Sequence, residues 1–562
     1  MKYVLKNYIL PILILVIVII VTFNQVVNSF YEQEEWLGIG SIFLYGRGYL
    51  LLIFKQHDLL NILLGEGRIL TSIITYFFSS TFPFNSIPIS LFALLLHTIN
   101  TILVFYLLKV LLKSQLPALF GALFFSVNAV AQSAVTWGAA ISTLPATTIV
   151  LFSLLAFFKS INFLELGGQI KHKWLIVSFI LLYISLLFKQ IGIFLIPLYF
   201  ITIILYSSEK QRLMEIILNF SRKYILPLTL FLITIIIYLI TYKSKSGPDI
   251  LFLTGSSANF YQTLITRILF YPLTSLSQLF VPPEQFLTFA RYITNLYYPF
   301  FPPEQFILVA QTSVLDLLSV ILSVVILILI HVLSRKSILS DKTKIWFFVV
   351  FTLSTFLPYV LISKSFSYLE SRYYYLGIVG AAYIIAWVIK TSSKFSRQMT
   401  WILNIFIVLF IFLHAYYVNL SIGKQASVNQ ERKNFLSQLN EIKPKLEGSK
   451  NVFYIIGNSD FYLPGHKVPF QNGMGHTLLV WYYRSGNMPQ ELIEARTMFE
   501  LGSQGYFEYG DLGFGYFSDL NRLKEIMGKY NLQSSAVVAL YYDGKNKKLI
   551  DNTEKFKQDL QQ

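Results

Sequence analysis

The sequence predicts an α-helical polytopic membrane protein that ends in a small α/β domain. Hydrophobic residues make up 55% of the 562-residue chain and charged residues only 13%, which is far from the composition of a soluble protein. The apolar residues form long runs, and the basic residues gather in short clusters between them. This distribution explains the net charge of +16 without a nucleic-acid partner. The chain has no cysteine, which excludes disulfides and thiolate metal sites.

The first apolar run, residues 8–27, is long enough to cross a hydrocarbon core about 30 Å thick. A signal peptide has a shorter apolar region and a cleavage site of small residues, so we interpret this run as an uncleaved helix. Ten further predicted spans bring the total to eleven, and they cover residues 88–111, 115–130, 139–158, 174–189, 191–207, 224–242, 311–333, 345–363, 372–389 and 400–422.

Basic residues mark every second connection between these spans, beginning with Lys2 and Lys6 before the first. Because Lys and Arg are retained on the cytoplasmic side, the pattern places the amino terminus in the cytoplasm of a multi-pass protein of the cell membrane. The predicted extracytoplasmic segments are residues 31–87, 243–310, 364–371 and 423–562. The chain thus divides into a transmembrane domain over residues 1–422 and an extracytoplasmic domain over residues 423–562.

The apolar segment 69–84 is short for a span and contains Pro83. Counting it as a span would reverse every later connection, so we predict a helix lying along or dipping into the outer face. In the tail, "NVFYIIG" and "SAVVALYYD" are typical of strands and "SDLNRLKEIMGKY" of a helix, which predicts a small α/β domain. "GYFEYGDLGFGYF" suits either a sugar-stacking surface or ordinary packing and turns, and packing is favoured.

Polar motifs recur in order at the outer ends of the predicted spans. They read "EEW", "KQHDLLN", "GEGRIL", "LHTIN", "FSVNAVAQSAVTWGAAISTL", "LLFKQIG" and "ESRYYYLGIVG". The set resembles the membrane half of the GT-C glycosyltransferases, particularly the protein O-mannosyltransferases and their tetratricopeptide-bearing relatives. The resemblance covers residues 8–422 and leaves the tail unmatched. The chain departs from the family pattern at several positions, with Gln132 and Gln190 in place of glutamates and Ser371 before Arg372.

The resemblance implies transfer of a sugar from a polyprenyl-phosphate donor to a protein or glycan acceptor on the outer face, with inversion. A carboxylate must then accept the proton of the attacking hydroxyl. Glu35 and Glu34 are the candidates, and Glu35 matches the second acid of the family pair; alternatively, these acids only solvate a helix end. Asp58 is a second candidate acid. With His57 it could help to bind a divalent cation, although one adjacent pair is not a recognisable ligand set.

Three cations at the outer ends could stabilise the phosphate that leaves the sugar, namely Arg372, Lys189 and Arg68. Their alternative role is to anchor the chain at lipid headgroups. The supporting residues of the predicted site are His97, Asn100, Gln132, Trp137 and Tyr373. His97 and Asn100 share one helix face, where interhelical hydrogen bonding is the favoured role. Trp137 is favoured as an interface anchor over a sugar platform.

Two other functions stay open at this point. A lipid or solute transporter needs charged groups along its span centres, whereas here they lie at span ends. A non-catalytic membrane assembly factor with an outer domain is compatible with Gln132 and Gln190, because both replace carboxylates of the family pattern.

Overall fold

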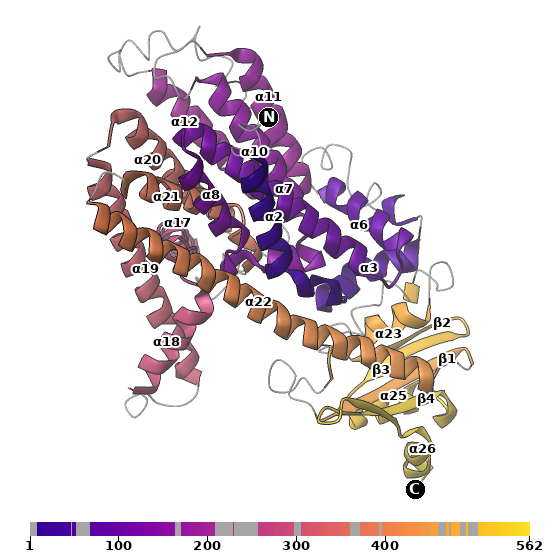
Figure 1. Cartoon of the computed structure of the whole chain (residues 1–562). Helices are drawn as coiled ribbons and strands as arrows, with labels where there is room; N and C mark the ends of the chain where they lie inside the picture. Colours follow the sequence, from indigo (N-terminus) through magenta and orange to yellow (C-terminus); the bar gives the residue numbers. More distant parts are fainter. Residues whose placement is uncertain are drawn as a thin grey trace.

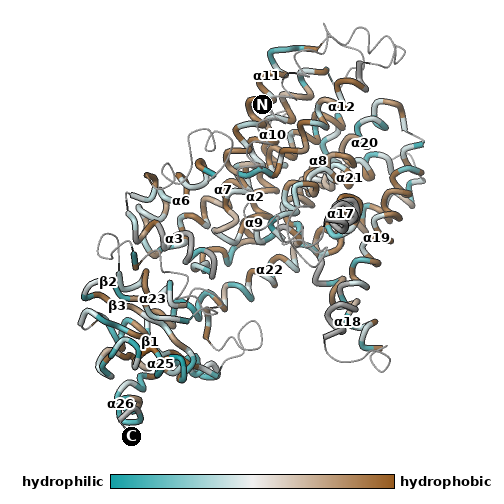
Figure 2. Tube along the Cα trace, turned by 180° about the vertical axis from the view of Figure 1, so that it is seen from behind, coloured by the Kyte–Doolittle hydropathy of each residue, from teal (hydrophilic) through white to brown (hydrophobic). Residues whose placement is uncertain are grey.

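A bundle of apolar helices and a small sheet domain are joined by one long helix (Figure 1). The computed structural model describes residues 8–46, 48–51, 68–162, 170–207, 229, 257–296, 305–335, 337–359, 371–392, 396–446, 448–458, 468–470, 474–483, 491–492 and 504–561. Hydrophobic residues dominate the bundle, and hydrophilic residues are more frequent in the sheet domain (Figure 2). The prediction of a mainly helical chain with apolar helices and a small carboxyl-terminal sheet is confirmed.

Short 3₁₀ turns interrupt the bundle helices where the predicted site motifs lie. The helices of the first half are α2 (Leu10–Thr22), α3 (Gln33–Tyr45), α6 (Ile69–Thr81), α7 (Ile87–Leu112), α8 (Gln115–Ser126), α9 (Ser133–Thr136), α10 (Thr143–Ser160), α11 (His172–Phe188) and α12 (Leu195–Ser207). Those of the second half are α17 (Ser257–Gln278), α18 (Pro283–Leu296), α19 (Gln305–Arg335), α20 (Leu339–Ser354), α21 (Gly377–Ser392) and α22 (Arg397–Ile442). The 3₁₀ turns are η2 (Asn24–Asn28), η4 (Ala129–Ala131), η5 (Gly138–Ala140), η6 (Gln190–Gly192), η8 (Leu357–Tyr359) and η9 (Ser371–Tyr373).

In the described part of the chain, four helices rather than eleven are long and apolar enough to cross a membrane. They are Ile87–Leu112, Gly138–Ser160, Ser313–Arg335 and Arg397–Ile442. Six shorter apolar helices are Leu10–Thr22, Ile69–Thr81, Gln115–Ser126, His172–Phe188, Gln190–Ile204 and Gly377–Ser392. At about 1.5 Å per residue these fall short of a 30 Å core, because loops or 3₁₀ turns end them early. The predicted span 224–242 lies outside the described residues.

Glycines allow close contacts between bundle helices. A Cβ atom at Gly121 of α8 would lie 2.6 Å from the backbone oxygen of Ala382 on α21. A Cβ atom at Gly380 of α21 would overlap the Thr352 hydroxyl on α20. Small residues at such crossings let helix backbones approach, which explains why α21 packs closely between its neighbours.

The tail is a five-stranded sheet with helices on both faces. The strand order is β2-β3-β1-β4-β5, and β1 (Lys450–Gly457) is parallel to both β3 (Leu512–Phe517) and β4 (Val537–Asp543). The outer strands β2 (Gly505–Tyr509) and β5 (Lys548–Asp551) are antiparallel to their neighbours. One face packs against α22 and α23 (Met474–Tyr482), and the other against α25 (Leu520–Lys529) and α26 (Thr553–Gln561).

The aromatic and glycine-rich stretch of the tail forms the two strands β2 and β3. Tyr506, Phe514 and Tyr516 are fully buried. The ring of Tyr506 lies against Gly513 and Gly515 on the neighbouring strand, where a Cβ atom would overlap it. The favoured interpretation of this stretch, ordinary packing, is confirmed.

Helix α3 of the predicted outer loop is packed onto the tail. Its Trp36, Ile39 and Phe43 share one hydrophobic core with Phe435 of α22 and Leu478 of α23. Helix α22 continues without a break past residue 422 to Ile442, so it links the bundle to the sheet domain as one rod (Figure 1). Helix α3 and the tail therefore meet at one end of the bundle.

Candidate functional site

Glu32 and Glu35, two acids of the predicted outer loop, form a capping box at the start of α3. The backbone N–H of Glu32 donates to Glu35 Oε2 at 2.5 Å, and the Glu32 side chain accepts from the backbone of Glu35 in return. Such a box satisfies N–H groups that a helix start leaves unpaired. Glu35 is only 6% exposed, and the backbone of Gly138 in η5 also donates to it. A side chain at Gly138 would overlap this carboxyl, so Glu35 is enclosed.

Burial, and next to it the charge of Glu32, raises the pKa of Glu35 to about 8. Desolvation favours the neutral form of a carboxyl, so Glu35 is mostly protonated near neutral pH. The side chain of the other predicted acid, Glu34, lies outside what the structure describes, as does the whole of Asp58.

Glu32 is the acid that faces other side chains. Gln425 of α22 donates from Nε2 to Glu32 Oε1 at 2.5 Å, and Gln132 donates to Gln425 Oε1 at 3.3 Å. The Arg432 guanidinium lies 3.8 Å from the same Glu32 oxygen. The predicted supporting residue Gln132 thus reaches the acids through Gln425.

The three predicted cations come together around Tyr373 of η9. Lys189 Nζ lies 5.2 Å from the centre of the Tyr373 ring, and the Arg372 guanidinium lies 5.1 Å from it. The exposed Arg68 is close enough to interact electrostatically with both Arg372 and Tyr373. We call Arg68, Lys189 and Arg372 the cation cluster.

Two of these cations are held by further partners. Lys189 is buried, and its Nζ donates to Thr143 Oγ1 at the start of α10 at 2.6 Å. The half-buried Arg372 stacks on Trp137, with 4.4 Å between the guanidinium carbon and the ring centre. A cation held over an indole ring keeps its charge while its position is fixed. Trp137 therefore supports Arg372 directly.

The segment 128–138 connects the acids to the cation cluster. Gln132 donates a hydrogen bond to Gln425, which in turn donates to Glu32. The backbone of Gly138 donates to Glu35, and the Trp137 ring stacks against Arg372. The segment is also tied to η9, because the Ser371 hydroxyl donates to the backbone oxygen of Val130. Acids and cations are thus two sides of one polar region at one end of the bundle.

His97 and Asn100 lie elsewhere, in a polar network between helices. His97 Nε2 donates to the backbone oxygen of Ser126 at 2.9 Å, and its Nδ1 accepts from the Tyr375 hydroxyl at 2.8 Å. Asn100 donates to Tyr375 Oη at 3.2 Å and accepts from Thr148 Oγ1 at 2.7 Å. This is the interhelical hydrogen bonding that the sequence favoured.

Within the described ranges, no group of three or more His, Cys, Asp or Glu side chains could hold a metal ion. His57 and Asp58, the pair considered for a divalent cation, lie outside these ranges.

The sequence interpretation missed Gln425 and Arg432, because both follow the predicted last span. A signal was present, since Gln425, Asn429 and Arg432 recur at positions i, i+4 and i+7 of one helix. That spacing places polar side chains on a single face.

Comparison of the chain with protein-family models, with curated proteins and with solved structures finds no match.

The buried carboxyl of Glu35 predicts a pH-dependent stability. Its pKa in the folded state is raised above the ordinary value of 4.5, so folding retains a proton that the unfolded chain loses. Stability should therefore fall as pH rises from about 4.5 to about 8, by about 1.4 kcal/mol per pH unit, and then level off. Glu35→Gln should remove this slope when thermal unfolding is followed against pH.

The matched control is Glu441→Gln on the exposed part of α22, which should keep the wild-type slope. Identical slopes in wild type and Glu35→Gln would contradict the assignment.

Proposed function

We propose that this chain is an integral-membrane glycosyltransferase. It moves a sugar from a polyprenyl-phosphate donor to a protein or glycan acceptor at the outer face of the membrane, with inversion. The observation that carries the proposal is the cation cluster of Arg68, Lys189 and Arg372 beside the acids of α3. Residues far apart in sequence supply these charges, and they lie at the end of an apolar bundle that we propose to be its outer end.

The cation cluster fits the leaving group of this reaction. As the bond between the anomeric carbon and the phosphate oxygen breaks, the electron pair stays on the phosphate. Fixed positive charge stabilises the charge that develops there. Thr143 holds Lys189 and Trp137 holds Arg372, so both cations are oriented before the donor binds.

The acids fit the acceptor side of the reaction. The acceptor oxygen attacks the anomeric carbon from the face opposite the phosphate, and its proton passes to a carboxylate. Both acids belong to the capping box, but Glu35 is only 6% exposed and enclosed by Gly138, whereas the Glu32 side chain is 18% exposed. We therefore favour Glu32 as the base and Glu35 as the residue that positions the start of α3. Glu34 and Asp58 stay candidates.

The distribution of cations supports the proposed orientation. Lys109 Nζ lies 3.3 Å from the ring centre of Tyr8, near the amino terminus. Lys344 Nζ donates to the backbone oxygen of Leu111, and Lys390 pairs with Asp341 at 2.9 Å. These groups lie at the ends of α7 and α21 that are opposite to the site, which is the pattern of a cytoplasmic face.

A non-catalytic assembly factor is the second candidate. The ion pair of Glu32 with Arg432 favours it, because that pair docks the tail whether or not chemistry occurs.

The orientation can be tested by cysteine labelling, since the chain has no cysteine of its own. Lys545→Cys in an exposed turn of the tail should react with an impermeant maleimide in intact cells. Lys342→Cys, exposed at the opposite end of the bundle, should react only after lysis. The reverse pattern would overturn the proposed topology.

Arg372→Ala should weaken binding of the polyprenyl-phosphate sugar by about tenfold to a hundredfold, as expected for loss of a charged hydrogen-bonding group. Arg372→Lys should restore binding only in part, because an ammonium lacks the planar fork and its stack on Trp137. Arg397→Ala, at an exposed arginine that begins α22, is the control and should bind normally. Equal donor affinity in all variants would remove Arg372 from the site.

Single-turnover measurements of sugar transfer should show which of Glu32, Glu34 and Glu35 is the base. Glu32→Gln should slow transfer by about 100-fold to 10,000-fold with little change in donor affinity, because the base acts on the acceptor. Glu35→Gln should act mainly on stability, and a large loss in Glu34→Gln instead would move the base to that residue.

Because Glu32→Gln also removes the carboxylate that lies 3.8 Å from the Arg432 guanidinium, its unfolding temperature must be measured in parallel. Glu508→Gln breaks the ion pair with Lys450, which is 2.7 Å long and lies within the tail, and serves as the matched control. Near-normal transfer in all three acid variants would exclude Glu32, Glu34 and Glu35 as the base and leave Asp58 as the candidate. Absence of transfer by the wild type would favour the assembly factor.

A further inference from the structure

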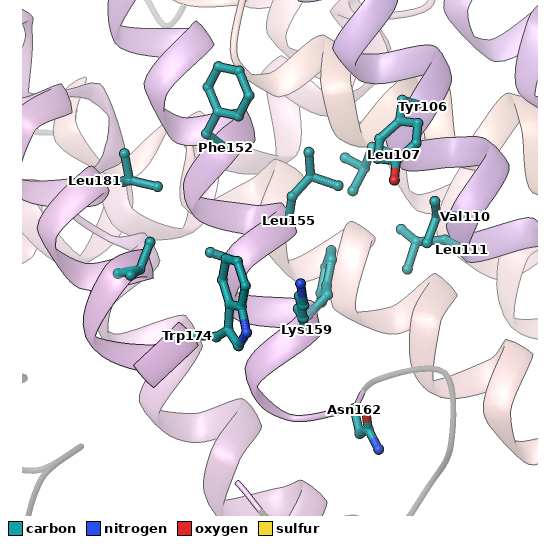
Figure 3. Close-up of a pocket in the computed structure, with 13 residues that line it drawn as sticks. Tyr106, Leu107, Val110, Leu111, Phe152, Leu155, Lys159, Asn162, Trp174 and Leu181 are labelled. Carbon is teal, nitrogen blue, oxygen red and sulfur yellow. The ribbon is translucent and has the colours of Figure 1, made fainter. Parts of the chain in front are cut away.

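A ligand-sized pocket lies far from the cation cluster, between α7, α10 and α11 (Figure 3). Its volume of about 500 Å³ is typical of pockets that bind small molecules. The wall is mainly apolar and includes Leu107, Val110, Leu155, Val177 and Leu181. We call it the lower groove.

The basic side chains of the lower groove lie near one of its ends. Lys159 Nζ lies 3.7 Å from the ring centre of Trp174. Asn162, just beyond the end of α10, accepts a hydrogen bond from Lys171 Nζ at 3.3 Å. Two ammonium groups therefore lie close to one end of an otherwise apolar surface.

The lower groove is open toward the outside of the bundle. Tyr106 and Phe152, which line it on α7 and α10, are 46% and 43% exposed. An apolar groove on the membrane-facing surface is open to hydrocarbon chains from the side. Lys159 lies at the carboxyl-terminal end of α10, whereas Thr143 at the start of the same helix contacts the cation cluster. The lower groove therefore opens at the opposite end of the bundle from the proposed donor site.

We propose that the lower groove binds an anionic diacyl phospholipid of the cytoplasmic leaflet. Its hydrocarbon would lie along the apolar wall, and its phosphate would lie near Lys159 and Lys171. The cytoplasmic leaflet is the anionic one, and basic pockets between membrane helices are suited to anionic headgroups. The inference depends on the proposed membrane orientation but not on sugar transfer.

The test uses the purified full chain in mild detergent and native mass spectrometry. Phosphatidylglycerol and phosphatidylcholine with identical acyl chains are added in turn, and retention of each is measured. Wild type should retain phosphatidylglycerol preferentially. Lys159→Gln should lower that retention about fivefold, as expected for one cation near an anionic headgroup, and leave phosphatidylcholine unchanged. Lys342→Gln removes an exposed charge that does not line the groove and should have no effect.

A second variant tests the apolar wall. Val177 is half-buried, so Val177→Trp can fill the groove with little disturbance of the core. It should lower phosphatidylglycerol retention severalfold at an unchanged unfolding temperature. Equal retention of both lipids by wild type would overturn the proposal, as would equal losses in Lys159→Gln and Lys342→Gln. Because no donor or acceptor is present, failure of the transferase proposal would not alter this result.

Discussion

A buried guanidinium on α22 fixes how the tail sits on the bundle. Arg432 is only 1% exposed, and a charge removed from water in this way needs partners. It donates to the backbone oxygen of Pro469 at 2.9 Å and to Asn429 at 2.8 Å, and it lies 3.8 Å from Glu32. Removing one partner of a buried charge costs about 3–5 kcal/mol. The start of α3 is therefore bound to the tail. The positions of the groups that contact α3, such as Gly138, depend on this interaction.

The irregular segment 128–138 next to this contact supplies polar side chains of the candidate site. The Asn128 side chain accepts from the backbone of Val130 and donates to the backbone oxygen of Leu279 at 2.9 Å. Buried backbone groups that leave a helix must find such partners within the protein. Once they do, a 3₁₀ turn can aim side chains that a continuous helix would direct elsewhere. In this segment the Gln132 side chain is directed to Gln425 beside the acids, and the Trp137 side chain is directed to Arg372.

Sequence patterns predicted the helical class, the α/β tail and the cations that converge, because each leaves a local signature. Lys189 and Arg372 are basic residues at predicted outer ends, where such residues are disfavoured, and this singled them out. Helix ends were less predictable, since hydropathy averages over a window and does not register that α20 ends at Ser354. Which of the neighbouring acids is enclosed depends on the residue where α3 begins. With Gln33 as the first helical residue, Glu35 becomes the inner member of the capping box, and composition alone could not have decided this.

The polar network inside the bundle bears on the choice between transfer and transport. His97, Asn100 and Tyr375 use their side-chain donors and acceptors on one another and on Ser126, Leu144 and Thr148. A satisfied network in a low-dielectric interior is rigid, and breaking it to admit a polar solute would leave several groups unpaired. A transport path through these helices would have to break it in every cycle. The proposed sugar transfer would not disturb it, because Arg372 and Lys189 face Tyr373 and Trp137 beyond the network. The bundle thus acts as a fixed support, which suits a reaction on a headgroup better than passage through the membrane.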